Sequence, residues 1–212
     1  MLGVTSRPQT AQRRKRASQR RAEITETAAA IAVSEGLEKV TAKRVADASG
    51  VFPGLVSHYF GTADELVAAA FAHAAASERE KLFGDAAAAG PPMAQLRRLL
   101  TCWLDADRDP VSLLWLDAWQ ASRRRPALRQ EVTRQMTADS DRLSALIRSG
   151  TEAGDWAAAD PAGTATQILS LVDGHSVQAA TRRTLDYTVV AAMVITVTER
   201  LLGLPPGALA PP

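Results

Sequence analysis

The amino-acid sequence predicts an all-α protein, and three observations lead to that class. Apolar residues recur at helical spacing along most of the 212 residues, and no alternating β pattern of useful length appears. Alanine is abundant and only 5% of the residues are aromatic, which favours helices over sheets. Residues 41–60 have the pattern of two short helices that meet at a tight turn. We therefore predict a small N-terminal head of three helices, joined by a long helix to a larger helical body.

Composition divides the chain into four segments. Residues 1–20 are rich in Arg and contain no acidic residue, which predicts a disordered basic arm. Residues 21–61 form the head, and residues 62–202 form the body. Residues 203–212, GLPPGALAPP, predict a disordered tail.

Charge is distributed unevenly between these segments. Residues 1–61 contain ten Lys and Arg against five acidic residues, whereas residues 62–212 contain fifteen against eighteen. An excess of positive charge at one end is typical of a domain that binds nucleic-acid phosphates. A single cysteine, no secretory signal and no apolar run of about 18 residues predict a cytoplasmic protein without a membrane partner.

The stretch at residues 41–60 carries specific helix signals. Thr41 is a good N-cap, and Gly50 ends the first helix because glycine enters the left-handed conformation without steric cost. Pro53 suits the first turn of the second helix. This pattern predicts a helix-turn-helix, whose second helix lies in a DNA major groove. Its outward residues would be Pro53, Gly54, Ser57, His58 and Tyr59.

The residues from RRAEITETAAAIAVSEG through TAKRVADASGV to HYFGTADEL, positions 21–66, resemble the DNA-binding domain of the TetR family of transcriptional repressors. The segments PGLVSHYF, LLWLDAW and LVDGHSVQAA look most like the branch that contains the choline-responsive repressor of betaine synthesis. The resemblance implies a homodimer that binds a palindromic operator in double-stranded DNA and is released by a small molecule.

We expect Thr41, Lys43 and Arg44 to contact phosphates, with the outward residues of the second helix in the groove. Four positions depart from the family pattern: Phe52 replaces the usual Ser N-cap, Ser57 the usual Tyr, Tyr59 the usual His, and Ala63 a Lys beside phosphate. These departures leave open an alternative, a helical small-molecule-binding protein or enzyme with a vestigial DNA head.

The rest of the chain predicts long helices. Thr62 with Glu65 forms a capping box that opens a helix to about residue 83. Residues 84–92 contain Gly and Pro and predict a break. Further helices are expected at 93–106, 110–124, 126–153, 160–183 and 188–202, and Trp156 is expected to anchor a loop.

Three tryptophans mark a possible ligand site in the body. Trp115 and Trp119 lie one helical turn apart, and Trp103 precedes them in the chain. With Asp117 and Asp173 as acidic candidates, they would suit an organic cation, although the effector itself stays unidentified. The alternative is that these tryptophans are ordinary core residues.

Two apolar stripes predict the dimer interface. The expected four-helix bundle, two helices from each copy, would use Ile168, Val172, His175, Ala179, Val190, Met193, Val194, Val197 and Leu201. The alternative is that both helices pack inside the monomer.

No constellation for catalysis appears in the sequence. His58, His73 and His175 fall in three separate predicted helices, and no HExxH, GxSxG, CxxC or glycine-rich phosphate loop occurs. We therefore predict a ligand-responsive transcriptional regulator, a repressor rather than an enzyme, without a metal or cofactor. Operator and target genes stay open, as does activation in place of repression.

Overall fold

The computed structural model describes the backbone of residues 7–182 and 186–210, with side chains from Ala17 onward, and over these residues all regular structure is helical. The elements are α1 (Arg7–Glu35), η1 (Leu37–Lys39), α2 (Ala42–Ser49), α3 (Pro53–Tyr59), α4 (Ala63–Ala87), α5 (Pro92–Leu104), η2 (Ala106–Arg108), α6 (Asp109–Ser122), α7 (Pro126–Ala153), α8 (Pro161–Ser176), η3 (Val177–Ala180) and α9 (Thr188–Leu201). The predicted all-α class is confirmed.

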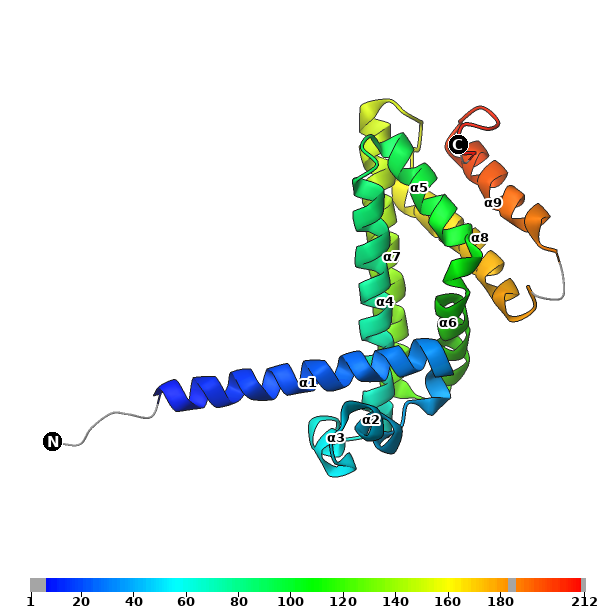
Figure 1. The fold of residues 1–212 in the computed structure, drawn as a ribbon. Coiled ribbons are helices and arrows are strands. Elements are labelled where there is room, and N and C mark those ends of the chain that lie inside the picture. Colours follow the sequence, from blue (N-terminus) through cyan, green and yellow to red (C-terminus); the bar gives the residue numbers. More distant parts are fainter. Residues whose placement is uncertain (1–6, 183–185, 211–212) are drawn as a thin grey trace.

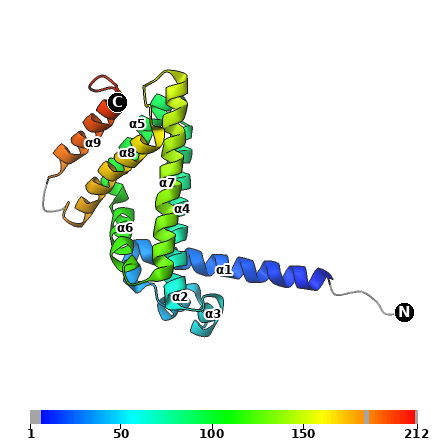
Figure 2. The ribbon, with the colours of Figure 1, turned by 180° about the vertical axis from the view of Figure 1, so that it is seen from behind.

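Helices α4 and α7 form the upright of the molecule and run side by side in the same direction (Figures 1 and 2). Helix α1 crosses their base and projects to one side, with α2 and α3 beneath it. Helices α5 and α8 lean against the upper part of the upright, and α9 lies along the outer side of α8 (Figure 1). The head is thus attached to the start of α4, and the body surrounds the end of α4.

The apolar core consists of two clusters, and α4 contributes to both. The lower cluster joins the head to the base of the body, because Phe71 of α4 packs edge-on against Trp115 of α6 with ring centroids 4.9 Å apart. The upper cluster lies between α4, α5, α7, α8 and α9 and contains Phe83 and Trp103. The head core therefore extends past residue 61 into the first turns of α4.

The predicted caps form where expected. The Thr41 hydroxyl accepts a hydrogen bond from the Arg44 amide, and the Thr62 hydroxyl accepts one from the Glu65 amide, each at 3.1 Å. Gly50 has a φ of 66° at the end of α2. Trp156 anchors its loop, since its indole N–H donates to the Ile147 carbonyl at 2.8 Å.

Both terminal segments differ from the prediction. Residues 7–20 belong to α1 rather than to a disordered arm, because Ala, Gln, Arg and Lys are good helix formers and no glycine interrupts them. Residues 203–210 are ordered as well. There Leu209 is buried, its amide donates to the Glu199 carboxylate at 2.9 Å, and Arg97 donates to the Ala208 carbonyl. Residues 1–6 and 211–212 lie outside the described part of the chain.

Two helix ends also differ. Helix α4 continues to Ala87, beyond the predicted end near residue 83, because Gly84 is exposed and the following alanines favour helix. Helix α8 ends at Ser176 and gives way to the 3₁₀ turn η3, seven residues before the predicted end at Arg183.

Candidate DNA-binding head and ligand cavity

Helices α2 and α3 form the predicted helix-turn-helix. Val45, Ala46 and Val56 are fully buried where the two helices meet α1, and the Val51 amide donates to the Ala46 carbonyl at 3.0 Å across the turn. The small Ala46 side chain permits this close approach. Phe52 stands at the N-cap of α3 without a side-chain hydrogen bond and is 85% exposed. The fold of the motif is therefore preserved although its usual second cap is absent.

The outward face of α3 contains most of the residues that the sequence analysis selected. Pro53, Gly54, Ser57 and His58 are exposed. Tyr59 is half-buried, packs against the head core and meets the His58 ring edge-on, with centroids 5.4 Å apart. Phe60 is buried in the head core. This short helix thus presents a small polar surface with little protruding bulk.

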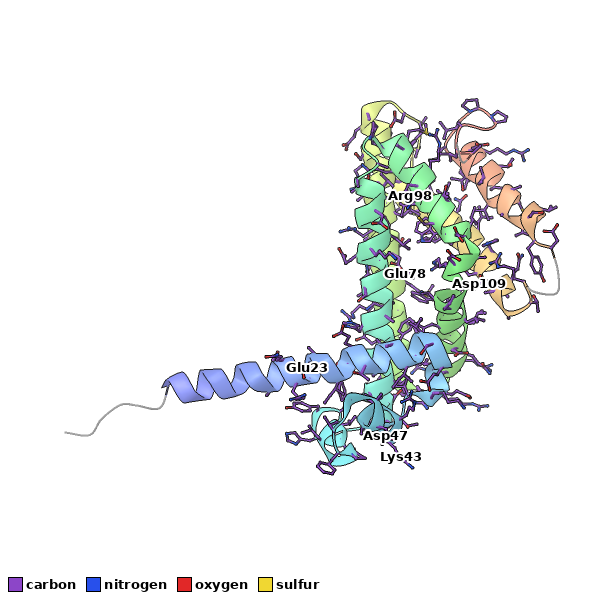
Figure 3. All side chains as sticks on the ribbon, viewed as in Figure 1. Glu23, Lys43, Asp47, Glu78, Arg98 and Asp109 are labelled. Carbon is purple, nitrogen blue, oxygen red and sulfur yellow. The ribbon has the colours of Figure 1, made fainter. Side chains whose placement is uncertain are left out.

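The three residues that were predicted to contact phosphates, at the start of α2, differ in their hydrogen-bond and ion-pair partners within the chain. Lys43 is exposed at the lower edge of the head, on the same helix as Asp47 (Figure 3). The Thr41 hydroxyl is engaged by the Arg44 amide. The Arg44 guanidinium forms a two-pronged ion pair with Glu35 at the end of α1, and the Arg44 Nε to Glu35 Oε2 distance is 3.0 Å. Through the same hydrogen bond, Arg44 lowers the pKa of the Glu35 carboxyl. Of the two basic residues, Arg44 is paired with Glu35, whereas Lys43 has no ion-pair partner among the described side chains.

The tryptophans surround a cavity of about 70 Å³ in the middle of the body. Trp115 and Trp119 face each other with ring centroids 5.5 Å apart, and Trp103 lies on another wall against Phe83. Helices α4, α5, α6, α7 and α8 all contribute to the lining. All three tryptophans therefore line one cavity, and their role in binding a ligand stays a prediction.

Of the two predicted acidic residues, one lines the cavity and one does not. Asp173 of α8 lies in the wall. Asp117 points instead towards the head, where its Oδ2 accepts a hydrogen bond from the Leu37 amide at 3.2 Å. The prediction of Asp117 as a cavity residue is therefore wrong, because two positions after Trp115 on a helix lie on another face. Asp117 instead joins α6 to η1, the turn that follows α1.

Sequence reasoning missed three further charged residues in the cavity wall. Glu78 of α4 and Arg108 of η2 form an ion pair, with Arg108 Nε 2.6 Å from Glu78 Oε1. Asp139 of α7 accepts a hydrogen bond from Arg79 at 3.2 Å. No sequence motif marks these residues, since they meet only when three elements assemble. The wall thus contains three carboxyl groups and one guanidinium group.

Two of these carboxyl groups have strongly raised pKa values. Burial raises the pKa of Asp173 to about 6, and the positive charge of Arg108 opposes that shift. Burial likewise raises the pKa of Asp139 to about 6, despite its hydrogen bond to Arg79. No hydrogen-bond partner of the Asp173 carboxyl is found within the described residues. The pKa of the Asp173 carboxyl is therefore close to neutral pH, and a positive charge beside it would stabilise its ionised form.

The predicted dimer residues fall into two groups. Ile168, Val172, His175 and Val194 are at most 3% exposed inside a single chain. They belong to the monomer core and have no surface left for a partner, so their assignment to the interface is wrong. The reason is that α8 packs between α7 and α9, which buries its apolar stripe within the chain.

The remaining members of the predicted set keep surface. Met193 is 45% exposed, and Ala179, Val190, Val197 and Leu201 are partly exposed. Val177 and Val189, which were not predicted, are 51% and 79% exposed. These residues give η3 and α9 an outward apolar surface.

Two kinds of feature are absent from the described residues. Residues 7–182 and 186–210 contain no group of three or more His, Cys, Asp and Glu side chains placed to hold a metal ion. Within the same ranges, no helix has the length and apolar character that crossing a membrane requires.

Comparison with known families gives two matches along the chain. Residues 24–70 match the family model of bacterial regulatory proteins of the tetR family, and residues 92–203 match that of the C-terminal domain of BetI-type transcriptional repressors. Together they cover the helix-turn-helix and most of the body, apart from residues 71–91.

A curated relative is the HTH-type transcriptional regulator BetI of Paraburkholderia phymatum, 33% identical over 118 residues. The match covers 52% of this chain and 58% of the relative, so the chain spans little more than half the length of the curated protein.

Solved structures have the same fold. A TetR transcription regulator from Haloarcula marismortui is similar with a TM-score of 0.67 and 20% identity, covering 88% of this chain and 97% of that one. The multidrug binding protein EbrR, complexed with proflavin, is similar with a TM-score of 0.61 and 26% identity, covering 86% and 99%.

Proposed function

Because this chain belongs to the TetR family of bacterial regulatory proteins, we propose that it is a transcriptional repressor that a small organic cation releases from DNA. The observation that carries the proposal is the connection of two sites by one helix. Helix α4 begins in the core of the helix-turn-helix and ends beside the tryptophan cavity. A ligand in the cavity therefore contacts the element that holds the head.

The DNA site is the outward surface of α2 and α3. Lys43 and the Thr41 end of α2 contact phosphates, and Ser57 and His58 contact base edges in the major groove. Arg44 contributes to phosphate binding only after it exchanges Glu35 for a phosphate oxygen. Glu35 thus competes with DNA for this guanidinium.

The ligand site is the tryptophan cavity, and its chemistry favours a cation. Indole faces attract a positive charge, and the carboxyl groups of the wall outnumber its single guanidinium. Asp173 is the counter-ion, since it has no hydrogen-bond partner within the described residues. A quaternary or aromatic ammonium ion fits this combination of aromatic walls and one unpaired acid.

The functional unit is a homodimer built on the outward surface of η3 and α9. Val177, Val189 and Met193 supply its exposed apolar centre. Two heads about 34–36 Å apart would enter successive major grooves of a palindrome. A ligand lowers DNA affinity only as far as it binds more tightly to a dimer with another head spacing.

Selection of binding sites from random duplex DNA tests the DNA part of the proposal. Purified protein is expected to enrich a palindromic sequence. Its affinity should fall steeply with salt, with a log-log slope of about −0.9 for each phosphate neutralised. A shallow slope and no enriched sequence would favour the alternative of a small-molecule-binding protein with a vestigial head, which the uncapped Phe52 position keeps open.

Titration of the protein–DNA complex with tetramethylammonium, choline and proflavin tests the ligand part. At least one cation should release DNA and change tryptophan emission, and Asp173→Asn should weaken that response. A neutral isostere of the active cation is the control. Release by the neutral compound at equal concentration would contradict the cation assignment.

A further inference from the structure

An open groove of about 790 Å³ lies between α1 and the body, next to the tryptophan cavity. Ala29 and Val33 of α1 form one apolar wall, and Ala74 of α4, Cys102 of α5 and Val111 of α6 contribute to the others. Glu78 of α4 and Arg98 of α5 belong to this lining, and Figure 3 labels both. The groove is thus bounded by the head helix and by three helices of the body.

The groove and the cavity share a wall. Glu78, Leu82 and Arg108 line both. The Glu78 and Arg108 side chains are only 14% and 13% exposed and form a two-pronged ion pair. The second terminal nitrogen of Arg108, Nη1, lies 3.2 Å from the Ser112 hydroxyl of α6 and 3.2 Å from the Ser176 hydroxyl of α8. One guanidinium therefore closes the wall and joins three helices.

We propose that this groove is the path by which the organic cation reaches the tryptophan cavity, and that Arg108 controls its passage. The inference rests on the proposed function, because it takes the cavity as the ligand site. It adds a route and a selectivity-determining residue that the cavity alone does not supply.

The chemistry of the shared wall explains why a cation would pass. Glu78 already binds one cation, the Arg108 guanidinium, and an arriving ammonium ion competes for the same carboxylate. When Arg108 leaves Glu78, its bonds to Ser112 and Ser176 also break. A neutral or anionic molecule offers no replacement partner to Glu78. It would leave a partly buried carboxylate unpaired, which is costly.

The charges along the groove also favour a cation. Acidic residues exceed basic ones among its lining side chains, which raises the local concentration of cations. The acidic residues are Glu26, Glu78, Asp85, Asp105 and Asp107, and the basic ones are Lys81, Arg98 and Arg108, with His73 beside them.

Cys102 supplies a direct test, because it lines the groove and is the only cysteine of the chain. Labelling it with a bulky maleimide leaves the sequence unchanged and narrows the path. We expect proflavin and tetramethylammonium to associate about tenfold more slowly with the labelled protein, as measured by stopped-flow tryptophan emission. The same reagent on Cys102→Ser is the control, and a melting curve verifies the fold.

A second label distinguishes the groove from another opening. Met136 of α7 lines the cavity but not the groove and is 44% exposed. The next residue, Thr137, is also exposed and lines neither of them. Labelled Thr137→Cys, in the Cys102→Ser background, should leave the association rate unchanged. Slowing there, with no slowing at Cys102, would overturn the groove as the path. Loss of all equilibrium binding by both cations in unlabelled protein would overturn the proposed ligand class, and this inference with it.

Arg108→Gln separates control of passage from simple repulsion. Passage control predicts that association and dissociation both become faster, by about tenfold, because the wall opens more often. Repulsion alone predicts tighter binding with slower dissociation, and that result would overturn the role of Arg108. Arg108→Lys keeps the charge but lacks the planar fork, so it should accelerate both rates as well.

Discussion

In the head, the decisive contacts join residues that are neighbours in the chain, whereas in the body they join distant ones. Thr41 caps the helix that follows it, and Gly50 ends that helix one turn after Ala46. In the body, Arg79 binds Asp139 and Arg108 binds Glu78, pairs that are 60 and 30 residues apart. Local signals therefore suffice to form the head helices, but the ligand cavity exists only once the whole body has assembled. Substitutions should reveal this difference.

The largest effect is expected where the two regions meet. Phe71→Ala removes a fully buried ring that packs against Trp115, and we expect a loss of about 3–5 kcal/mol in the free energy of unfolding. Because head and lower body share one core, far-UV circular dichroism and tryptophan emission should follow a single urea transition. Phe52→Ala, at an exposed position, is the control and should change stability by about 0.5 kcal/mol or less. Two separate transitions would show that the regions unfold independently.

A smaller loss is expected from crowding within the body. A Cβ atom at Gly150 of α7 would lie 2.0 Å from the Trp156 ring, so Gly150→Ala must displace this anchor. We expect a loss of about 2–3 kcal/mol, measured by urea unfolding. Gly84 of α4 is exposed, and a Cβ atom added there would have no other atom within 4 Å. Gly84→Ala should therefore leave the free energy of unfolding unchanged or raise it by about 1 kcal/mol. Equal effects of the two substitutions would contradict the tight packing at Gly150.

Ligand affinity should depend on pH through the carboxyl groups of the cavity. Asp173 and Asp139, each with a pKa of about 6, face Glu78, Arg108 and Arg79. Below pH 6 protonation of Asp173, the proposed counter-ion, removes the negative charge that attracts a cation, so affinity should fall by up to about tenfold for each unit of pH. Isothermal titration between pH 5 and 8 measures this, and Asp173→Asn should flatten the dependence. A pH-independent affinity would exclude Asp173 as the counter-ion.

Stability without ligand should change in the opposite sense. The native state keeps these protons up to about pH 6, whereas in unfolded chains the aspartates lose them near the ordinary value of 3.8. The two groups therefore destabilise the fold above pH 6, and this destabilisation disappears as the pH falls towards 4.

The smallest effect is expected in the head. Thr41→Ala removes the N-cap of α2 and should cost about 1 kcal/mol of stability. It should weaken binding to all DNA sequences alike, since the cap positions the helix near phosphates without contacting bases. Thr133→Ala is the matched control, because that hydroxyl donates only to a carbonyl of its own helix. A changed sequence preference at constant overall affinity would contradict this role of Thr41.

The same difference explains what the sequence could predict. The helix-turn-helix follows from Thr41, Gly50 and Pro53, whose effects act within one or two turns. That the tryptophans lie together could be predicted from the sequence, because Trp115 and Trp119 lie one helical turn apart. The sequence could not predict that Glu78, Arg108 and Asp139 meet, since they come from three different elements and belong to no motif.

The errors have a physical origin as well. Asp117 was close to the tryptophans in the chain but lies on another face of α6, where it binds the head. The apolar stripe of α8 indicated burial without indicating which partner buries it, and α7 and α9 of the same chain do so. The ordered tail depends on Glu199, a carboxylate whose partner cannot be read from the Pro and Gly composition around it.

The sharing of α4 between two cores has a mechanical consequence. A helix of 25 residues is a rod about 37 Å long, and the head is fixed to one end of it by buried contacts rather than by a flexible joint. Tilting this rod by about 5° displaces the far end by about 3 Å, close to the 3.4 Å step between stacked base pairs. With the Ala87 end of α4 held in place, a displacement of about 1 Å at Glu78 thus corresponds, at the DNA, to misplacing a head by about one base pair.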